Sequence, residues 1–110
     1  MSPKSSLSYS SAVILQAVAN GYVYGFEVMD ATGLPSGTVY PALRRMETSG
    51  LVESSWESEA AAQRDGRPAR KYYEITAAGR DELAEAVRRY RHLERLLPED
   101  GRPKPSPSRG

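Results

Sequence analysis

The hydrophobic positions follow helical spacing in four segments of the chain. In residues 9–18, 25–31, 36–49 and 77–97, apolar side chains return every three or four positions and leave polar or charged side chains on the other faces. Glycine and proline residues separate the first three segments. We therefore predict three short helices in the first half of the chain and one long helix in the second half.

Two other segments alternate apolar and polar residues, which is typical of β-strands. They are residues 51–56 and 71–76, and a polar stretch with the turn signal Asp65-Gly66 separates them. The pair predicts a β-hairpin with a long basic loop. The order helix, helix, turn, helix, hairpin, long helix is that of a winged helix-turn-helix. The predicted fold class is therefore mainly α with a small β-hairpin, followed by a long C-terminal helix.

The third predicted helix contains one residue that propensity disfavours. Ser36 is a good N-cap, and Val39, Leu43 and Met46 form a narrow stripe that faces the core. Pro41 lies beyond the first position, where a proline removes a backbone hydrogen bond, so propensity alone favours a helix that begins at Pro41. We predict the longer helix, which begins near Ser36.

Composition limits the chemistry that the chain can perform. Its 110 residues suit one domain, and its hydrophobic and charged fractions, 39% and 26%, are ordinary for a globular protein. With no cysteine and a single histidine, His92, we expect no metal site and no cofactor. No apolar run is long enough to cross a membrane, and the first residues lack the pattern of a signal peptide, so we expect a cytoplasmic protein.

The outward side chains of the third helix suit contacts with double-stranded DNA. Hydroxyl groups near a helix N-terminus can donate to phosphates, and arginine can reach a phosphate or a guanine edge. The net charge is only +1, but residues 64–71 hold four cations and one anion, and such groups supply the electrostatic part of DNA binding. The predicted DNA-binding residues are Ser36, Thr38, Tyr40, Arg44, Arg45, Arg64, Arg67, Arg70 and Lys71.

The last predicted helix is too long for one small domain to cover. About 20 residues of helix span about 30 Å, so part of the apolar stripe needs another partner, and a second copy of the chain is the natural one. The predicted dimer contacts are Leu83, Val87, Tyr90, Leu93 and Leu97.

These segments predict a division of the chain into four parts. A loose N-terminus covers 1–7, a winged helix-turn-helix DNA-binding domain covers 8–76, a dimerisation helix covers 77–97, and a disordered tail covers 98–110. The tail carries cations, and the sequence leaves open whether they contact DNA.

Three features of the hairpin have ordinary structural interpretations. We expect Trp56 to pack beside the hairpin and one of the adjacent Tyr72 and Tyr73 to reach the core, because neighbours on a strand point to opposite faces. The acidic residues within 53–59 are expected to be solvated.

Two stretches of this sequence, GTVYPALRRMETSGLVESSWE and GRPARKYYEITAAGRDEL, resemble the PadR family of bacterial transcriptional regulators. The family's pattern is a Gly-Thr-x-Tyr-Pro-x-Leu-x-Arg-Leu-Glu helix, then Gly-Leu, then a basic wing before (Arg/Lys)-Tyr-Tyr-x-x-Thr-x-x-Gly. The resemblance covers roughly residues 9–97 and includes Pro41, so it implies the longer third helix. It also implies that this helix enters the DNA major groove and that the single C-terminal helix of small members serves dimerisation.

The sequence departs from the family's pattern in three places. Tyr24-Gly25-Phe26 stands where His-Gly-Tyr is frequent, and Met46 stands where leucine is usual. Some members stack aromatic drugs on a tryptophan of the C-terminal helix, whereas the only tryptophan of this chain is Trp56, on the first predicted strand.

Together these features predict a DNA-binding transcriptional regulator. We expect a homodimeric repressor that binds an inverted repeat and is released by an effector, for which a small molecule is one candidate, or by a condition. A winged-helix module that binds a protein instead of DNA is the alternative, because the net charge is only +1. An enzyme is not expected, since the chain has no glycine-rich phosphate loop, no cysteine and no evident pair of catalytic carboxylates. Operator, regulated genes, effector and the sign of regulation stay open.

Overall fold

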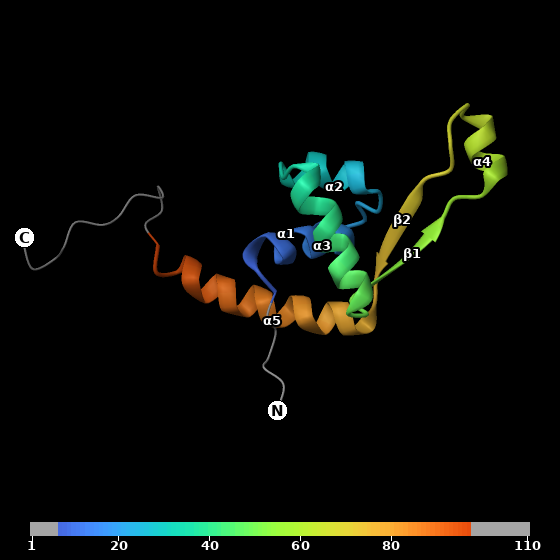
Figure 1. Cartoon of the computed structure of the whole chain (residues 1–110). Helices are drawn as coiled ribbons and strands as arrows, with labels where there is room; N and C mark the ends of the chain where they lie inside the picture. The colour runs from blue at the N-terminus through green and yellow to red at the C-terminus, as the bar shows by residue number, and fades with distance from the viewer. Residues whose placement is uncertain (1–6, 98–110) are drawn as a thin grey trace, which may run out of the picture.

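The computed structural model describes residues 7–97 of the chain (Figure 1). Its elements are α1 (Tyr9–Ala19), α2 (Gly25–Thr32), α3 (Ser36–Thr48), β1 (Val52–Trp56), α4 (Glu59–Arg64), β2 (Lys71–Ile75) and α5 (Ala77–Glu94). The predicted fold class is confirmed, since helices dominate and the two strands form one antiparallel hairpin. The predicted tail 98–110 and the predicted loose N-terminus, apart from Leu7, lie outside the described residues.

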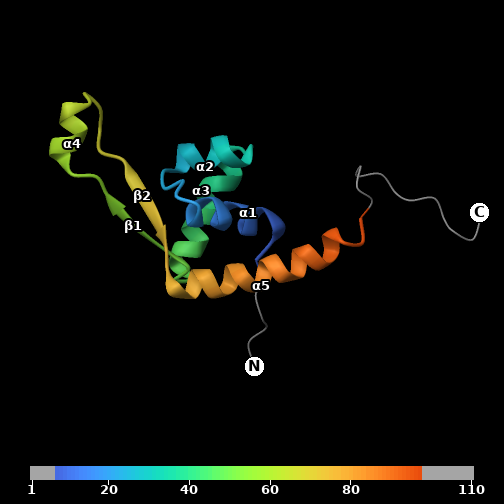
Figure 2. The same cartoon turned by 180° about the vertical axis from the view of Figure 1, so that it is seen from behind.

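One hydrophobic core joins the first three helices to the hairpin and to the first half of α5. Helix α5 runs along α1, and its last turns extend beyond the other helices in both views (Figures 1 and 2). None of the helices within residues 7–97 combines the length and the apolar character that a membrane crossing requires. The largest fully buried side chains are Ile14, Leu15, Val28, Val39, Leu43 and Val52.

The predicted core stripe of α3 is confirmed, and the structure explains its proline. Val39, Leu43 and Met46 are buried. Pro41 lies inside the helix on the side away from this stripe. The carbonyl that loses its hydrogen bond is that of the exposed Gly37, where water can reach it.

The N-cap of α3 is a correction to the sequence prediction. The helix begins at Ser36, and the residue before it, Pro35, has the extended backbone of an N-cap. The carbonyl oxygen of Pro35 accepts hydrogen bonds from the N–H groups of Thr38 and Val39 at 2.9 and 3.0 Å. The prediction that Ser36 is the N-cap is therefore wrong by one residue, because the proline takes the extended conformation that a cap requires.

The hairpin contains a short helix that the sequence pattern did not predict. Helix α4 occupies the segment that was predicted as a loop. Ser58 accepts a hydrogen bond from the N–H of Ala61 at 3.1 Å, and Ala62 is buried. Gly66, with φ of +68°, follows the end of the helix, so the predicted turn residue ends α4 instead of joining the two strands directly.

Two further predictions about the second half of the chain need correction. Trp56 does not pack beside the hairpin, because 66% of its surface is exposed. The long helix ends at Glu94 rather than Leu97. The prediction that one of the two adjacent tyrosines reaches the core is confirmed, since Tyr73 is buried and Tyr72 is only half-buried.

The start of α5 is attached to the chain that leaves α3. Thr76 donates its backbone N–H to the Leu51 carbonyl at 3.0 Å and its hydroxyl to the Gly50 carbonyl at 2.7 Å. The same hydroxyl oxygen accepts a hydrogen bond from the Gly79 N–H at 2.9 Å and so caps α5. Gly79 lies directly against the Leu51 carbonyl, which leaves no room for a side chain.

We expect the variant Gly79→Ala to be destabilised by about 1–3 kcal/mol, since overpacking at a rigid backbone contact has this cost. The added methyl group would overlap the Leu51 carbonyl oxygen and lie 2.8 Å from Cγ1 of Ile75. Chemical denaturation of the purified variant measures the change. Gly37→Ala is the matched control, because nothing lies within 4 Å of that position and alanine favours a helix by about 0.5–1 kcal/mol over glycine. Equal stability of the two variants would contradict the proposed contact.

Candidate nucleic-acid interface

The outward face of α3 carries most of the side chains that were predicted to contact DNA. Ser36, Arg44 and Arg45 are exposed, and 38% of the surface of Tyr40 is exposed, whereas Thr38 is half-buried. Within residues 7–97, the guanidinium groups of the two arginines take part in no ion pair. Both charges are therefore available to an external anion.

Tyr40 also has a packing role that the sequence did not indicate. Its ring lies against the backbone of Gly25, where a Cβ atom would overlap it. The glycine thus lets the first turn of α2 approach α3 closely. The ring edge of Tyr40 and its hydroxyl oxygen both lie against Gly25, so this contact holds the side chain in place.

The base of the wing, which we define as residues 52–75, is joined to α3 through one carboxylate. Glu47 accepts a short hydrogen bond from the Ser54 hydroxyl at 2.5 Å, and one of its oxygens lies 3.6 Å from Nζ of Lys71. Burial raises the pKa of the nearby Tyr73 hydroxyl, and the charges of Lys71, Glu47 and Arg44 act on it as well. Of the predicted DNA-binding residues, Lys71 lies with its Nζ 5.7 Å from the ring centre of this tyrosine, and the charge of Arg44 lowers the pKa of its hydroxyl from further along α3.

Glu57 organises the outer part of the wing. Its carboxylate accepts two hydrogen bonds from the Arg67 guanidinium, at 2.6 and 3.1 Å, and one from the Tyr24 hydroxyl at 2.8 Å. The backbone N–H of Arg70 donates a further bond at 2.9 Å. Arg67 also reaches Asp65 at 3.1 Å. We call the group of Tyr24, Glu57, Arg67 and the Arg70 backbone the wing clamp.

The wing clamp changes the acid–base properties of its members. The hydrogen bonds from Arg67, and then that from Tyr24, lower the pKa of Glu57 from its ordinary 4.5 to about 2. The hydrogen bond to Glu57 raises the pKa of Tyr24 and also that of Arg67. The prediction that the acidic residues of 53–59 are all solvated is therefore wrong for Glu57, whose side chain is only 11% exposed.

The remaining predicted cations of the wing lie in different surroundings. Arg70 places its guanidinium 4.7 Å from the ring centre of Phe26 and 5.8 Å from that of Tyr24, and these two rings are stacked. Arg64 is exposed at the end of α4. Of the four predicted wing cations, Arg67 is thus neutralised by carboxylates and Lys71 pairs with Glu47 of α3. Arg64 and Arg70 have no carboxylate partner in the described part of the chain.

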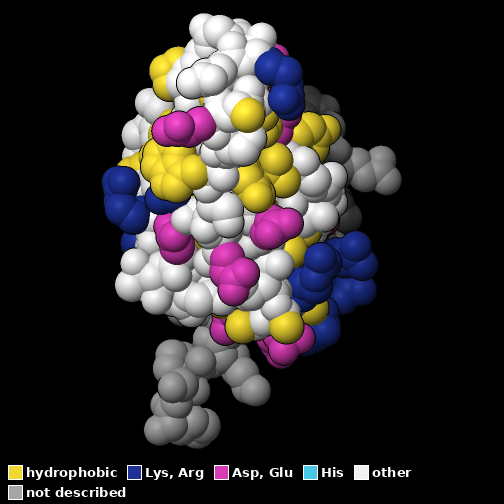
Figure 3. Space-filling model, turned by 90° about the vertical axis from the view of Figure 1, so that its right-hand side faces the viewer, with side chains coloured by type: hydrophobic (Ala, Val, Ile, Leu, Met, Phe, Trp, Pro, Cys, Tyr) yellow, Lys and Arg dark blue, Asp and Glu magenta, His cyan; other side chains and the backbone are white. Residues whose placement is uncertain are grey.

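Figure 3 views the molecule from the side of the wing. Acidic side chains lie in the middle of this face, basic side chains lie along its edges, and hydrophobic side chains are exposed between them. The charges of this face are therefore mixed, which agrees with the small net charge of +1. Within residues 7–97 no cluster of acidic or histidine side chains is arranged to hold a metal ion.

The residues predicted at the dimer contact divide into two groups along α5. Leu83 is only 8% exposed and belongs to the core of its own protomer, and Val87 packs against that core. Tyr90 donates its hydroxyl to the Leu7 carbonyl at 2.9 Å, whereas Leu93 and Leu97 are 48% and 56% exposed. Leu83 is therefore a correction to the predicted dimer surface, because its side chain is already covered.

A groove of about 310 Å³ continues the exposed part of α5 onto α1. Tyr9, which is 59% exposed, forms one wall and meets Tyr90 edge to face, with the ring centres 5.2 Å apart. Val13 and Val87 line the groove from the two helices. An apolar surface thus runs from the side of α1 to the end of α5.

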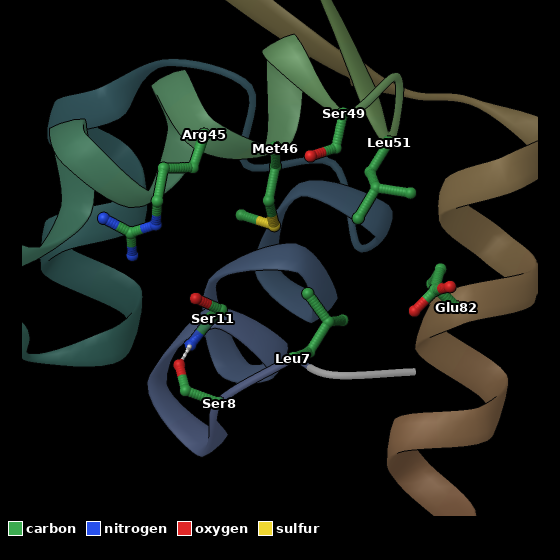
Figure 4. Close-up of a pocket in the computed structure, with 8 residues that line it drawn as sticks. All are labelled: Leu7, Ser8, Ser11, Arg45, Met46, Ser49, Leu51 and Glu82. Carbon is green, nitrogen blue, oxygen red and sulfur yellow. Dashed lines mark hydrogen bonds between the residues drawn. The ribbon is translucent and has the colours of Figure 1, made fainter. Parts of the chain in front are cut away.

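A second cavity, of about 390 Å³, lies between the start of α1, the second half of α3 and α5 (Figure 4). Met46 and Leu51 give it apolar walls, and Ser11 lies on α1. Arg45 and Glu82 border it from α3 and α5. The cavity therefore contacts both the helix with the predicted DNA-binding residues and the helix with the predicted dimer residues.

Comparison with known proteins relates this fold to one family. The model of the transcriptional regulator PadR-like family matches residues 14–85, which is more than half of the chain. The crystal structure of a PadR family transcription regulator from hypervirulent Clostridium difficile R20291 has a TM-score of 0.69 and 28% sequence identity, and the match covers 81% of this chain and 94% of that one. No curated protein matches the chain.

Two further solved structures are similar. A PadR-like transcriptional regulator from Bacillus cereus strain ATCC 14579 has a TM-score of 0.63 and 27% identity, with 78% of this chain and 84% of that chain covered. BpsR of Bordetella bronchiseptica, whose DNA binding is regulated by 6-hydroxynicotinic acid, has a TM-score of 0.69 and 21% identity, with 91% and 74% covered. At that identity the likeness to BpsR shows the fold alone.

The wing clamp predicts a stability difference that depends on pH. Because the pKa of Glu57 falls from 4.5 to about 2 on folding, its ionised carboxylate stabilises the fold fully above about pH 4.5, and this stabilisation is lost as the pH falls toward 2. Glu57→Gln should therefore unfold more readily than the wild type at neutral pH, and the two should converge near pH 2. Thermal unfolding across this range measures the difference, with the exposed Glu53→Gln as control. A difference independent of pH would contradict the ionised clamp.

Proposed function

This chain belongs to the PadR-like family of transcriptional regulators, and we propose that it is a homodimeric repressor that binds an inverted-repeat operator. In this proposal α3 enters the major groove and the wing lies along the neighbouring backbone or minor groove. The family consists of transcription regulators rather than enzymes. The proposed DNA contacts are Ser36, Thr38, Tyr40, Arg44, Arg45, Arg64, Arg70 and Lys71.

One observation carries the proposal for α3. Arg44 is exposed on its outward face, Arg45 is exposed at the edge that borders the cavity of Figure 4, and within residues 7–97 no carboxylate neutralises either of them, although acidic residues are abundant in the chain. Arginine at such a position pairs with phosphates or with the O6 and N7 atoms of guanine. The absence of an internal partner within residues 7–97 favours an anion outside the protein as the partner of the two side chains.

Arg67 has a different role in the proposed complex. It holds the wing through Glu57 and Asp65, so its charge is not free for a phosphate. We therefore propose that Arg67 holds the wing in position and does not contact DNA directly. Because the clamp orders the wing before DNA arrives, less conformational entropy is lost when the complex forms.

The exposed end of α5 and the residues that follow it support the proposed dimer. Leu93, Leu96 and Leu97 are 48%, 71% and 56% exposed, and such a row of leucines marks an association surface. We propose that residues 77–97, of which α5 is the helical part, form the dimerisation segment and that residues 8–76 form the DNA-binding part. A two-fold axis through α5 would place two copies of α3 on related half-sites, which is why an inverted repeat is the expected operator.

The alternative function is a winged-helix module that binds a protein instead of DNA. The net charge of +1, and the pairing of Arg67 and Lys71 with carboxylates, favour it. Salt dependence separates the two functions, because DNA binding through several phosphates weakens steeply as salt concentration rises. The predicted small-molecule effector stays a prediction.

We expect Arg44→Ala to weaken operator binding by about 1–3 kcal/mol if the side chain contacts a base. If it contacts the DNA backbone instead, the slope of the logarithm of the binding constant against the logarithm of the salt concentration should fall by about 1. The operator is first located by protection mapping of the DNA around the protein's own gene, and binding is then measured by fluorescence anisotropy. Arg88→Ala, an equal change of charge at an exposed position of α5, is the control. If Arg44→Ala and the double variant with Tyr40→Phe added both bind the operator like the wild type, α3 is not part of the interface.

The proposed dimer surface predicts a monomeric variant. Leu93→Arg places a charge among exposed leucines and should raise the dimer dissociation constant at least tenfold, which corresponds to about 1.4 kcal/mol. Sedimentation velocity measures the association, and thermal unfolding shows whether the protomer stays folded. Ala84→Arg, an exposed position on the opposite side of α5, should leave the dimer intact. The surface is assigned wrongly if Leu93→Arg dimerises like the wild type.

A further inference from the structure

We infer that Trp56 is an additional DNA-contact residue, whose indole ring packs on the sugar–phosphate backbone beside the groove that α3 enters. The inference rests on the proposed DNA binding and adds a contact that is neither charged nor part of α3. It begins from the exposure of the side chain, which at 66% is the second highest among the large hydrophobic side chains of the described residues. The most exposed of them, Leu96, belongs to the proposed dimer surface.

The register of the hairpin shows which way Trp56 faces. Residues paired across the strands share a face, and alternate residues along a strand share it too. Trp56 pairs with Lys71, and Ser54 pairs with Tyr73. Ser54 donates its hydroxyl to Glu47 of α3. This face of the hairpin is therefore the one that faces α3, and Trp56 is its outermost member on β1.

The indole lies where α3 no longer covers that face. Tyr73, nearer the core, is only 7% exposed, whereas Trp56, two pairs further out, is 66% exposed. Lys71, its partner across the hairpin, lies 3.6 Å from Glu47 and so joins this position to the surface of α3. A ligand that contacts α3 and this face of the wing together therefore finds Trp56 as an exposed side chain next to it.

The chemistry of the surroundings favours a nucleic-acid backbone as that ligand. Lys71 pairs with Trp56 across the hairpin and places its Nζ 5.7 Å from the ring centre of Tyr73, and the exposed Arg44 adds a second cation on α3. The indole offers a flat apolar face for a deoxyribose and an N–H group that can donate to a phosphate oxygen. On the opposite face, Tyr24 and Glu57 occupy the hairpin with the wing clamp, so the two faces serve different purposes.

The sequence supplies its own probe, because Trp56 is the only tryptophan of the chain. Its emission is followed while the wild-type protein is titrated with the mapped operator duplex and with a scrambled duplex of equal length. Anisotropy of a dye on the DNA reports binding independently. We expect the emission to shift to shorter wavelength in parallel with the anisotropy, since the ring leaves water.

Two variants of the same position measure the contribution of the ring. Trp56→Ala should weaken operator binding about fivefold to thirtyfold, and Trp56→Phe should weaken it less, because phenylalanine keeps an aromatic face and loses the N–H. Neither should change the melting temperature or the salt dependence, since the side chain is exposed and uncharged. Tyr22→Ala, which removes an exposed aromatic ring between α1 and α2, should bind like the wild type.

The possible results are distinct. Binding with an emission shift and a weakened Trp56→Ala variant supports the inference. Binding without a shift, or with Trp56→Ala equal to the wild type, overturns it and leaves the proposed DNA binding intact. An emission shift that grows with protein concentration in the absence of DNA assigns the ring to a second copy of the chain and also overturns it. A failure of every duplex to bind at low salt overturns the proposed function and this inference together.

Discussion

The meeting point of Leu51, Thr76 and Gly79 constrains the rest of the structure. The chain that leaves α3 and the chain that enters α5 share two hydrogen bonds there, and Gly79 allows direct contact between backbones. Because the hairpin leaves and returns at the same point, its strands must pair in one register. The direction of α5 relative to α3 follows from the same contact, so the surface proposed for DNA and the surface proposed for a second copy are held by one junction.

The location of the charged side chains in this molecule matters more for binding than the net charge does. Glu57 and Glu47 use part of the basic charge of the wing for internal order, whereas Arg44 and Arg45 keep theirs at the surface of α3. A composition with a net charge of +1 is therefore compatible with a local cationic surface. Ordering a basic loop with a carboxylate lowers its total charge, and it also holds the remaining cations in place.

Periodicity predicted the elements that short-range spacing controls. The buried stripe of α3 and the alternation of the two adjacent tyrosines were correct, because both depend on the geometry of one element. Helix α4 was missed because its six residues are too few for a periodic pattern, and the turn signal beside it dominated the interpretation. Glu57 was missed because its partners Tyr24 and Arg67 lie 33 and 10 positions away. Leu83 and Leu93 lie on one stripe, and spacing cannot show which of them the protomer itself covers.

The place of the wing clamp has a consequence for how the hairpin can vary. Glu57 precedes α4 and Arg67 follows it, so the clamp closes the hairpin at the base of its tip. Helix α4 has its own cap at Ser58 and its own end at Gly66, and it needs little from the rest of the molecule. The exposed residues of α4 can therefore be exchanged while the strands keep their direction, whereas the buried Ala62 and Asp65, which pairs with Arg67, are constrained. The strands of the wing are thus fixed by the clamp, and variation of the hairpin is confined to the exposed residues of its tip.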